Sequence, residues 1–423
     1  MSVVGIIAEY NPLHNGHTHH LEYARKMTSS QSCVCVLSSN FVQRGEPALI
    51  SKWARTKMAL SSGADLVLEL PSAFSCASAE YFASGAVSIL NSLGIIDYLS
   101  FGSEVGNIED LQIAAEILAY EEDDFKENLR QELDKGLSFA VARQAALKSV
   151  LAQRAGYNVE NTIDAINKPN NILGIEYLKA IKRFNSSMKP VTILRKGQGY
   201  NSLDRTSSFS SATAIRHHLK ESPDKALINN DPFMQSNMSE ACLDILFQEI
   251  ESGRTPVFPN NFTDILLHSL RSMPLNSIAS LPYMGEGLEN RLKKAAIESV
   301  SFDDIVNKVV TSRYPASRIK RILFSLLTGM TEEFLNELKV NGYAQYIRVL
   351  GFNDAGRDLL SSMKKSASLP LLVKPANFLK LENLAKKLFE HEIRATDAYV
   401  LGYSDPSQRI GGQEYTCSPI YFK

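Results

Sequence analysis

The chain has 423 residues, a formal net charge of −1, 44% hydrophobic residues and 22% charged residues. Its length exceeds that of one ordinary domain, so we expect two or three domains. The composition is that of a soluble globular protein, and the near-neutral charge excludes a globally basic one. Any nucleic-acid surface must therefore be a local patch.

Other bounds come from the apolar runs and the cysteines. No apolar run is long enough to span a membrane, and no basic segment precedes an apolar one at the N-terminus, so we expect neither a membrane segment nor a signal peptide. The cysteines show no metal-type pairing and indicate free, mostly buried thiols in a reducing cytoplasm. They are Cys33, Cys35, Cys76, Cys242 and Cys417.

Apolar runs in the first half of the chain predict five buried parallel strands. They are Val3–Ala8, Cys33–Leu37, Leu66–Leu70, Tyr98–Phe101 and Val191–Leu194. Helical segments separate these runs, and they are His17–Lys26, Lys52–Ser61, Ala79–Leu93, a charged insertion from Ile108 to about Gln153, and Ile172–Phe184. Pro169 marks the start of the last helix, with Asn170 or Asn171 as its cap. The alternation predicts a doubly wound, mainly parallel, five-stranded Rossmann-like α/β sheet.

The texture changes after about Glu221. Residues 222–237 are rich in Pro, Asn, Asp and Ser and indicate a linker. Amphipathic segments then predict a mainly helical second region, with a short strand at Tyr346–Leu350 and some α+β character at Asp397–Gly402. We therefore expect a nucleotide-binding domain over 1–221 and a mainly helical domain over 238–423.

The most informative segment is Gly5–His17, which predicts a buried strand, a tight polar turn and the first turn of a helix. The unpaired N–H groups at a helix N-terminus attract phosphate. His14 and His17 fall on one helix face, and Gly16 between them allows a ligand to approach the backbone. Imidazoles placed there can donate hydrogen bonds to a nucleoside triphosphate. The alternative is a turn followed by an exposed helix.

A second candidate phosphate site is Ser210–Arg216, where small hydroxyls and Arg216 open a helix after the fifth strand. The alternative is an ordinary serine cap with an exposed arginine. Phe101–Glu104 ends the fourth strand, where ligands of such sheets bind, and Gly102 would allow a base or ribose to lie on bare backbone. The alternative is a plain turn that ends the strand.

Two further segments suit a second, anionic substrate. Asn40–Pro47 follows the second strand and combines polar and charged side chains, with Lys52, Arg55 and Lys57 after it. Ser312–Arg321 brings four cations and a tyrosine to a helix start, a pattern that can grip a nucleic-acid backbone. Solvated surface segments are the alternative in both cases.

These motifs resemble the nucleotidyltransferase group related to class I aminoacyl-tRNA synthetases. Nearly the whole chain is similar to one family in it, the bacterial tRNA(Met) cytidine acetate ligases. The segments that carry this narrower resemblance are Gly5–His17, Asn40–Pro47, Lys52–Leu60, Pro169–Gly174, Arg313–Arg321 and Arg348–Gly356.

The resemblance implies that ATP activates acetate as acetyl-adenylate, with pyrophosphate released. The acetyl group then passes to the exocyclic amine of the wobble cytidine of elongator tRNA(Met), with release of AMP and no use of coenzyme A. Mg²⁺ is expected with ATP, although no carboxylate cage is visible.

Motifs and resemblance together give the expected site residues. His14 and His17 are the expected catalytic residues. The expected ATP-binding residues are Ile7, Ala8, Glu9, Tyr10, Asn11, Pro12, His14, Gly16, His17, His20, Gly102, Asn170, Arg195, Ser211, Thr213 and Arg216. The expected tRNA-binding residues are Gln43, Arg44, Lys52, Arg55, Arg313, Arg318, Lys320 and Arg321.

One position departs from the family pattern. Ser39 stands where the family is expected to have glycine, and a serine there would be strained if the backbone needs a positive φ. Two other functions remain open at this point: an adenylyltransferase that leaves AMP on a small acceptor, and a non-catalytic RNA-binding scaffold.

Overall fold

The computed structural model describes residues 2–137, 139–153, 168–195, 210–222, 230–285 and 287–423. All five predicted strands are present, each parallel to its neighbours among them. They are β1 (Val3–Ala8), β2 (Ser32–Ser38), β5 (Leu66–Leu70), β6 (Tyr98–Ser103) and β7 (Lys189–Leu194). The doubly wound, mainly parallel sheet is thereby confirmed.

The sheet is larger than the five strands predicted from the sequence. In the described residues it has eight strands in the order β10-β8-β5-β2-β1-β6-β7, with β9 beside β8. The added strands are β8 (Ile347–Phe352), β9 (Leu371–Leu372) and β10 (Ile420–Tyr421). β8 runs antiparallel to β5 and covers its edge, which would otherwise expose unpaired backbone groups. The sheet thus draws strands from both regions that the sequence analysis separated.

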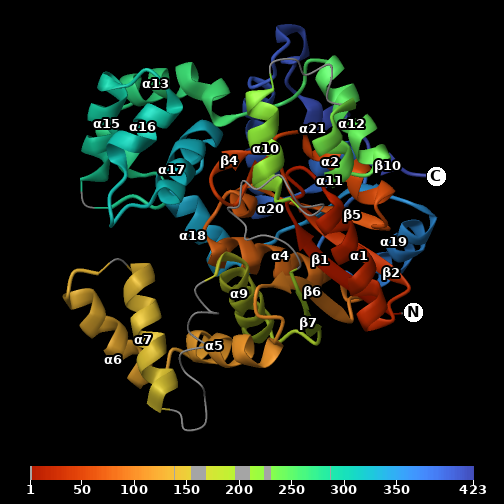
Figure 1. Cartoon of the computed structure of the whole chain (residues 1–423), viewed down its shortest axis with the longest axis horizontal. Coiled ribbons are helices and arrows are strands. Elements are labelled where there is room, and N and C mark those ends of the chain that lie inside the picture. The colour runs from red at the N-terminus through yellow and green to blue at the C-terminus, as the bar shows by residue number, and fades with distance from the viewer. Residues whose placement is uncertain (1, 138, 154–167, 196–209, 223–229, 286) are drawn as a thin grey trace.

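Helices cover both faces of the sheet (Figure 1). Alternate strand residues divide into two cores, one on each face. One core includes side chains of α4 (Ala79–Leu93), α5 (Ile108–Tyr120), α9 (Pro169–Arg183) and α19 (Asp354–Ser366). The other includes those of α1 (Asn15–Thr28), α2 (Lys52–Ser61), α10 (Ala212–Glu221), α11 (Pro232–Asn237) and α12 (Glu240–Glu251).

The predicted insertion forms three helices, α5, α6 (Asp123–Asp134) and α7 (Phe139–Gln153). The last two project from the sheet region in Figure 1. A further core is built mainly by helices of the second half. These are α13 (Thr263–Ser272), α14 (Leu275–Ala279), α15 (Leu288–Glu298), α16 (Phe302–Val309), α17 (Ala316–Thr328) and α20 (Asn383–Val400). Phe41, from the loop after β2, packs into this core against Phe324 and Tyr399.

The remaining elements are short or lie between these layers. They are β3 (Phe41–Val42), β4 (Glu46–Pro47), α3 (Ser72–Ser75), α18 (Glu332–Val340), α21 (Gln413–Thr416) and the 3₁₀ turns Pro259–Phe262, Pro375–Lys380 and Pro406–Gln408. Within the described ranges, no helix has the length and apolarity needed to cross a membrane.

Three local predictions were wrong. Residues 232–237 of the expected linker form α11, because Asp231 caps the helix and Pro232 occupies its first position. Residues 397–400 end the long helix α20 rather than forming a strand. The cap of α9 is Lys168, so neither Asn170 nor Asn171 is a helix cap. The cysteines are free as predicted, although Cys76 and Cys417 are only partly buried.

Candidate active site

The first part of the site lies at the junction of β1 and α1. In the strand order, β1 lies between β2 and β6, so the chain turns to opposite sides of β1 and leaves a crevice at the carboxyl ends of these strands. His14 is the N-cap of α1, and its Nδ1 accepts a hydrogen bond from the Gly16 N–H at 3.0 Å. His17 Nδ1 accepts in turn from the His14 N–H at 3.3 Å. The two imidazoles therefore satisfy backbone donors of the first helical turn.

These bonds determine which ring nitrogens carry protons. A backbone N–H can only donate, so Nδ1 of each imidazole is unprotonated and the neutral ring carries its proton on Nε2. Burial, followed by repulsion from Arg195 and Arg216, lowers the pKa of His14 to about 3. Burial and the neighbouring His14 likewise hold the pKa of His17 well below its usual value. Both side chains are thus neutral hydrogen-bond donors at physiological pH.

Arg216 of α10 is fixed against the loop that leads to α1. Its guanidinium donates to the Asn11 carbonyl oxygen at 2.7 Å and to the Thr213 hydroxyl at 3.1 Å. Ser211 is the N-cap of α10, and its hydroxyl accepts from the Ala214 N–H at 3.1 Å. The capping alternative is therefore correct for Ser211, whereas Arg216 reaches the cavity.

The carboxyl ends of β6 and β7 supply the opposite wall. The Glu104 carboxylate accepts from both the backbone and the side-chain nitrogen of Asn170, the latter at 2.6 Å. The Asn170 side-chain oxygen accepts from Arg195 at 3.3 Å. Asn171 is fully buried and accepts from the Glu104 N–H at 2.8 Å. Asn170 rather than Asn171 therefore faces the site.

These parts enclose a cavity of about 580 Å³, in the range of ligand pockets. Most of the predicted ATP-binding residues line it, and they are Ile7, Ala8, Glu9, Tyr10, Asn11, His17, His20, Gly102, Asn170, Arg195 and Arg216. Five others do not line it, and they are Pro12, His14, Gly16, Ser211 and Thr213. These five residues lie at or next to the N-terminal ends of α1 and α10, where they help to hold the lining residues in place.

The cavity also has an apolar wall that the motifs did not indicate. Its members are Ala79, Phe82, Phe101, Pro169, Ile172, Leu173 and Tyr177. Most come from α4 and α9, whose apolar residues are indistinguishable in sequence from core residues. Pro315 and Ser317 bring the start of α17 to the cavity, although this helix belongs to the second half of the chain.

The predicted tRNA-binding residues divide into four groups. Gln43, Arg44 and Arg321 line the cavity. Arg318 and Lys320 are partly buried, the first donating to the Tyr283 carbonyl oxygen at 2.8 Å and the second paired with Glu46 at 2.6 Å. Arg313 is exposed beside Tyr314.

Lys52 and Arg55 form the fourth group and correct the prediction, because both are fully buried. Arg55 donates to the backbone carbonyl oxygens of Glu9 and Ser38, each at 2.8 Å. Arg55 therefore joins the loop after β1 to the end of β2 from inside the protein, and its buried side chain cannot contact RNA.

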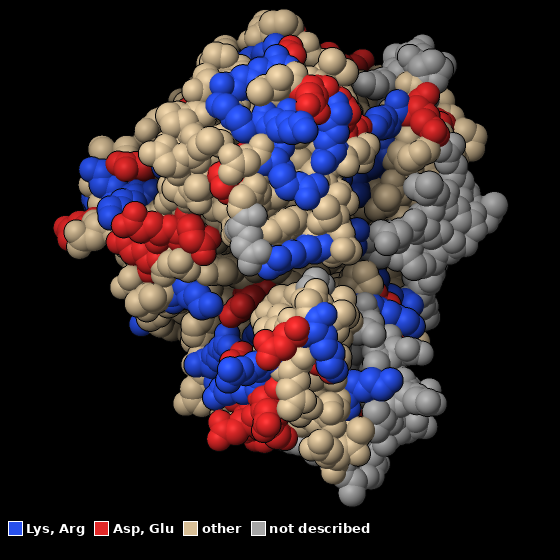
Figure 2. All heavy atoms as spheres, turned by 90° about the vertical axis from the view of Figure 1, so that its left-hand side faces the viewer, with Lys and Arg blue, Asp and Glu red and all other residues tan. Residues whose placement is uncertain are grey.

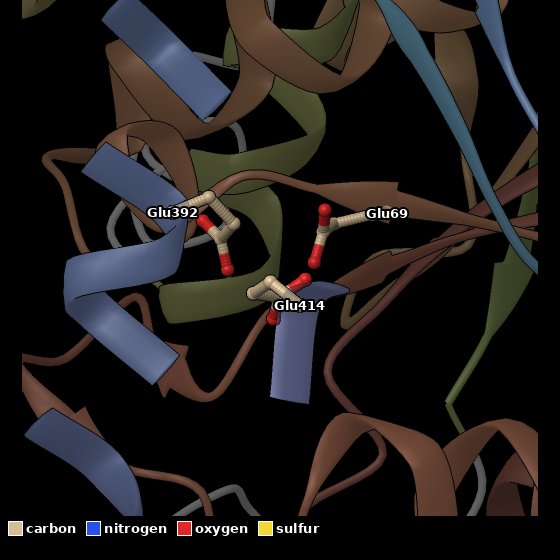
Figure 3. Close-up of side chains that lie close together, drawn as sticks. All are labelled: Glu69, Glu392 and Glu414. Atoms are coloured by element: carbon tan, nitrogen blue, oxygen red, sulfur yellow. The ribbon is translucent and has the colours of Figure 1, made fainter. Parts of the chain in front are cut away.

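Lys52 lies among three buried carboxylates. Figure 3 shows Glu69, Glu392 and Glu414 pointing toward one another. They are the one group of three potential metal ligands found in the described residues. Lys52 Nζ contacts all three, at 3.1 Å from Glu392 and 2.5 Å from Glu414, so an ammonium already occupies the place of a cation. The cluster is an ion-pair network rather than a metal centre.

The Ser39 departure has a structural explanation in this network. Ser39 does not adopt a positive φ. Its hydroxyl donates to the Glu392 carboxylate. Serine thus adds a hydrogen bond that glycine would lack, and it fixes the start of the loop that carries Gln43 and Arg44.

Comparison with known proteins identifies the family to which the chain belongs. The model of the HIGH Nucleotidyl Transferase family matches residues 1–414. The tRNA(Met) cytidine acetate ligase of Acetivibrio thermocellus is 46% identical over 417 residues, which are 98% of this chain and 99% of the relative. The chain belongs to the tRNA(Met) cytidine acetate ligase family.

Further members support this assignment. The tRNA(Met) cytidine acetate ligase of Halothermothrix orenii is 41% identical over 98% of both chains. The crystal structure of Thermotoga maritima TmcAL bound with alpha-thio ATP matches the whole of both chains with a TM-score of 0.92 and 35% identity. The apo form of that ligase matches with a TM-score of 0.94. An ATP analogue is therefore bound by a structural relative of the ligase family whose fold this chain shares.

Proposed function

We propose that this chain activates acetate with ATP and acetylates the wobble cytidine of elongator tRNA(Met). The observation that carries this proposal is the pair of neutral imidazoles at the start of α1, of which His17 lines the cavity together with Arg195 and Arg216 while His14 lies directly behind it. Its family membership supports acetate and tRNA(Met) as the other two substrates, because the relatives are named for them.

The first step follows from the placement of the donors. Acetate attacks the α-phosphorus of ATP, and the bond to pyrophosphate breaks. The Nε2–H groups of His14 and His17, together with the α1 N-terminus, stabilise the negative charge that develops on the phosphate oxygens. Arg195 and Arg216 add charge-assisted hydrogen bonds. Because all four groups are held by backbone or side-chain contacts, little reorganisation is needed in the transition state.

We assign the second substrate to the side of the cavity formed by the loop after β2 and by α17. Gln43 and Arg44 lie on this loop, and Arg321 donates to the Gln43 carbonyl oxygen at 3.1 Å. Residues 1–221 would then bind and activate the small substrates, and residues 238–423 would bind most of the tRNA. Lys and Arg side chains gather on the upper part of the face in Figure 2, the side on which α13, α15 and α16 lie in Figure 1. Such a local patch suits a polyanion despite the neutral total charge.

We further propose that ATP enters with Mg²⁺ on its phosphates, that coenzyme A takes no part, and that the chain works in the cytoplasm. Glu9 is the one carboxylate among the described residues that line the cavity, so no set of protein carboxylates would enclose the metal.

The decisive experiment incubates purified protein with ATP, Mg²⁺, radiolabelled acetate and total bacterial tRNA, without coenzyme A. We expect label in one tRNA species, recovered as N4-acetylcytidine, with one AMP released for each acetyl group. Pyrophosphate release that requires a small-molecule acceptor in place of tRNA, with AMP left on that acceptor, would contradict the proposal and favour an adenylyltransferase.

A further inference from the structure

Glu9 differs from every other residue around the cavity. It is the sole acidic side chain among the described lining residues, in a site whose proposed small substrates are anions. A carboxylate placed to contact ATP phosphates or acetate would repel them. The Glu9 carboxylate is nevertheless fixed, because its Oε1 accepts a hydrogen bond from the Gln43 N–H at 2.7 Å. The carboxylate is therefore better suited to a hydrogen-bond donor than to a bare phosphate or acetate oxygen.

The contacts of Glu9 place it between the two halves of the site. It follows β1 and precedes the turn that leads to His14, and its backbone carbonyl oxygen accepts from Arg55. Its side chain reaches the loop after β2, whose Gln43 in turn accepts from Arg321 of α17. This is the boundary at which an activated acetyl group would meet an incoming base.

His14 and His17 are unsuited to accept a proton from that base, and His20 Nε2 is already 3.1 Å from the Ser100 hydroxyl. Nδ1 of His14 and Nδ1 of His17 already accept hydrogen bonds from backbone N–H groups. Their Nε2 atoms carry the protons that serve the phosphates. Glu9 is the one carboxylate of the described lining residues that could take the proton instead.

We infer that Glu9 is a further catalytic residue, which accepts a hydrogen bond from the exocyclic amine of the target cytidine and takes its proton during acetyl transfer. This inference rests on the proposed function. Carboxylates are suitable acceptors for the N4 amino group of cytosine. Burial raises the pKa of Glu9, although the Gln43 N–H, Arg216, Arg44 and Arg55 oppose this shift. A raised pKa makes a carboxylate a better base near neutrality.

The cytidine N4 lone pair attacks the carbonyl carbon of acetyl-adenylate, and a C–N bond forms. The C–O bond to the phosphate breaks, and its electron pair leaves with AMP. One proton passes from N4 to the Glu9 carboxylate and then to solvent.

The test separates the two steps in Glu9→Gln. The amide keeps the size of the side chain and an acceptor oxygen but cannot take the proton. Acetyl-adenylate formation is measured without tRNA, by trapping with hydroxylamine as acetyl-hydroxamate. Acetyl transfer to tRNA is measured in a single turnover, and tRNA affinity by filter binding. Glu22→Gln is the matched control, because Glu22 is exposed on α1 outside the cavity.

We expect Glu9→Gln to form hydroxamate and bind tRNA within about threefold of the wild type but to transfer acetyl about 10²–10³-fold more slowly. Glu22→Gln should retain both steps. Equal losses in both steps would assign Glu9 to ATP, and unchanged transfer would exclude a base, so either result would overturn the inference. Wild-type protein that forms no hydroxamate from acetate would instead overturn the proposed function, and this inference with it.

Discussion

The imidazole rings of His14 and His17 lie with their centroids 3.9 Å apart, and His17 Nδ1 accepts from the backbone N–H of His14. The Nδ1 atoms satisfy the helix start, and in the proposed function the Nε2–H groups donate to the phosphates. A substitution of His17 can separate the capping of the helix from the donation to a ligand, if the new side chain keeps an acceptor for the His14 N–H but has no distal donor.

His17→Asn is such a substitution, because the Asn side-chain oxygen can accept from the His14 N–H while the distal donor is lost. We expect pyrophosphate release with acetate to fall about 10²–10³-fold, a loss typical of one missing transition-state donor. Thermal unfolding should change little, whereas His17→Ala should also lose about 1 kcal/mol of capping. Full pyrophosphate release by His17→Asn would contradict the proposed role.

The protonation states of the site histidines are directly measurable. Burial is the main cause that lowers the pKa of His14 to about 3 and that of His20 to about 4. We expect their ring NMR signals to stay constant from pH 5 to 8 in the ligand-free protein, whereas the urea-unfolded chain titrates near 6.5. Since the unfolded chain binds these protons first, the two groups should reduce stability as pH falls from about 6.5 toward 4. Signals that move with a midpoint near 6.5 would contradict this.

Lys52→Met tests whether Lys52 is structural. Lys52 is fully buried and contacts Glu69, Glu392 and Glu414, so its loss leaves three carboxylates with Arg348 as their remaining cation. We expect the free energy of unfolding in urea to fall by about 3–5 kcal/mol. The double variant Lys52→Met, Glu392→Gln should recover part of this loss. A stable Lys52→Met protein with weakened tRNA binding would restore the original prediction of an RNA contact.

The same network predicts pH effects of opposite sign. Burial raises the pKa of Glu69 to about 7, although Lys52 opposes the shift. Between pH 4.5 and 7 the folded chain keeps a proton that the unfolded chain releases, so this group stabilises the fold less as pH rises. We expect the stability of the wild type relative to Glu69→Gln to fall across this window.

Glu392 provides the opposite case. Its burial is outweighed by Lys52, Ser39 and the Ser72 N–H, which lower its pKa to about 2. The stability that Glu392 contributes is therefore complete above pH 4.5 and is lost as the pH falls toward 2. We expect the wild type to gain stability relative to Glu392→Gln as the pH rises from 2 to 4.5. Urea titrations at pH 3, 5 and 7.5 measure both differences, and a pH-independent difference for either variant would contradict its assignment.

Gly45 controls how the second-substrate loop meets α17. Its φ is +73°, and an added Cβ would lie 2.4 Å from the Arg321 nitrogen. We expect Gly45→Ala to lose about 1–3 kcal/mol of stability and to weaken tRNA binding, because Gln43 and Arg44 would move with the loop. Gly342→Ala is the matched control, since Gly342 has a φ of +84° with nothing within 4 Å of its Cβ. Equal effects of the two substitutions would show that the contact with α17 is unimportant.

The sequence by itself determined the features that depend on local order. The five strands from Val3–Ala8 to Val191–Leu194 were evident because apolar runs alternate with amphipathic helices. The helix start at His14 was evident because its residues are contiguous. Most of the predicted ATP-binding residues line the cavity for the same reason, since carboxyl ends of parallel strands meet at one edge of a sheet.

Only the tertiary structure decided which charged residues face the site. Lys52 and Arg321 are both cations in polar segments, yet Lys52 is enclosed by three carboxylates from β5, α20 and α21, whereas Arg321 reaches the cavity. The pairing of β8 with β5 likewise joins residues far apart in the chain. Burial, pairing and sheet order depend on contacts between distant segments, and local periodicity carries no information about those contacts.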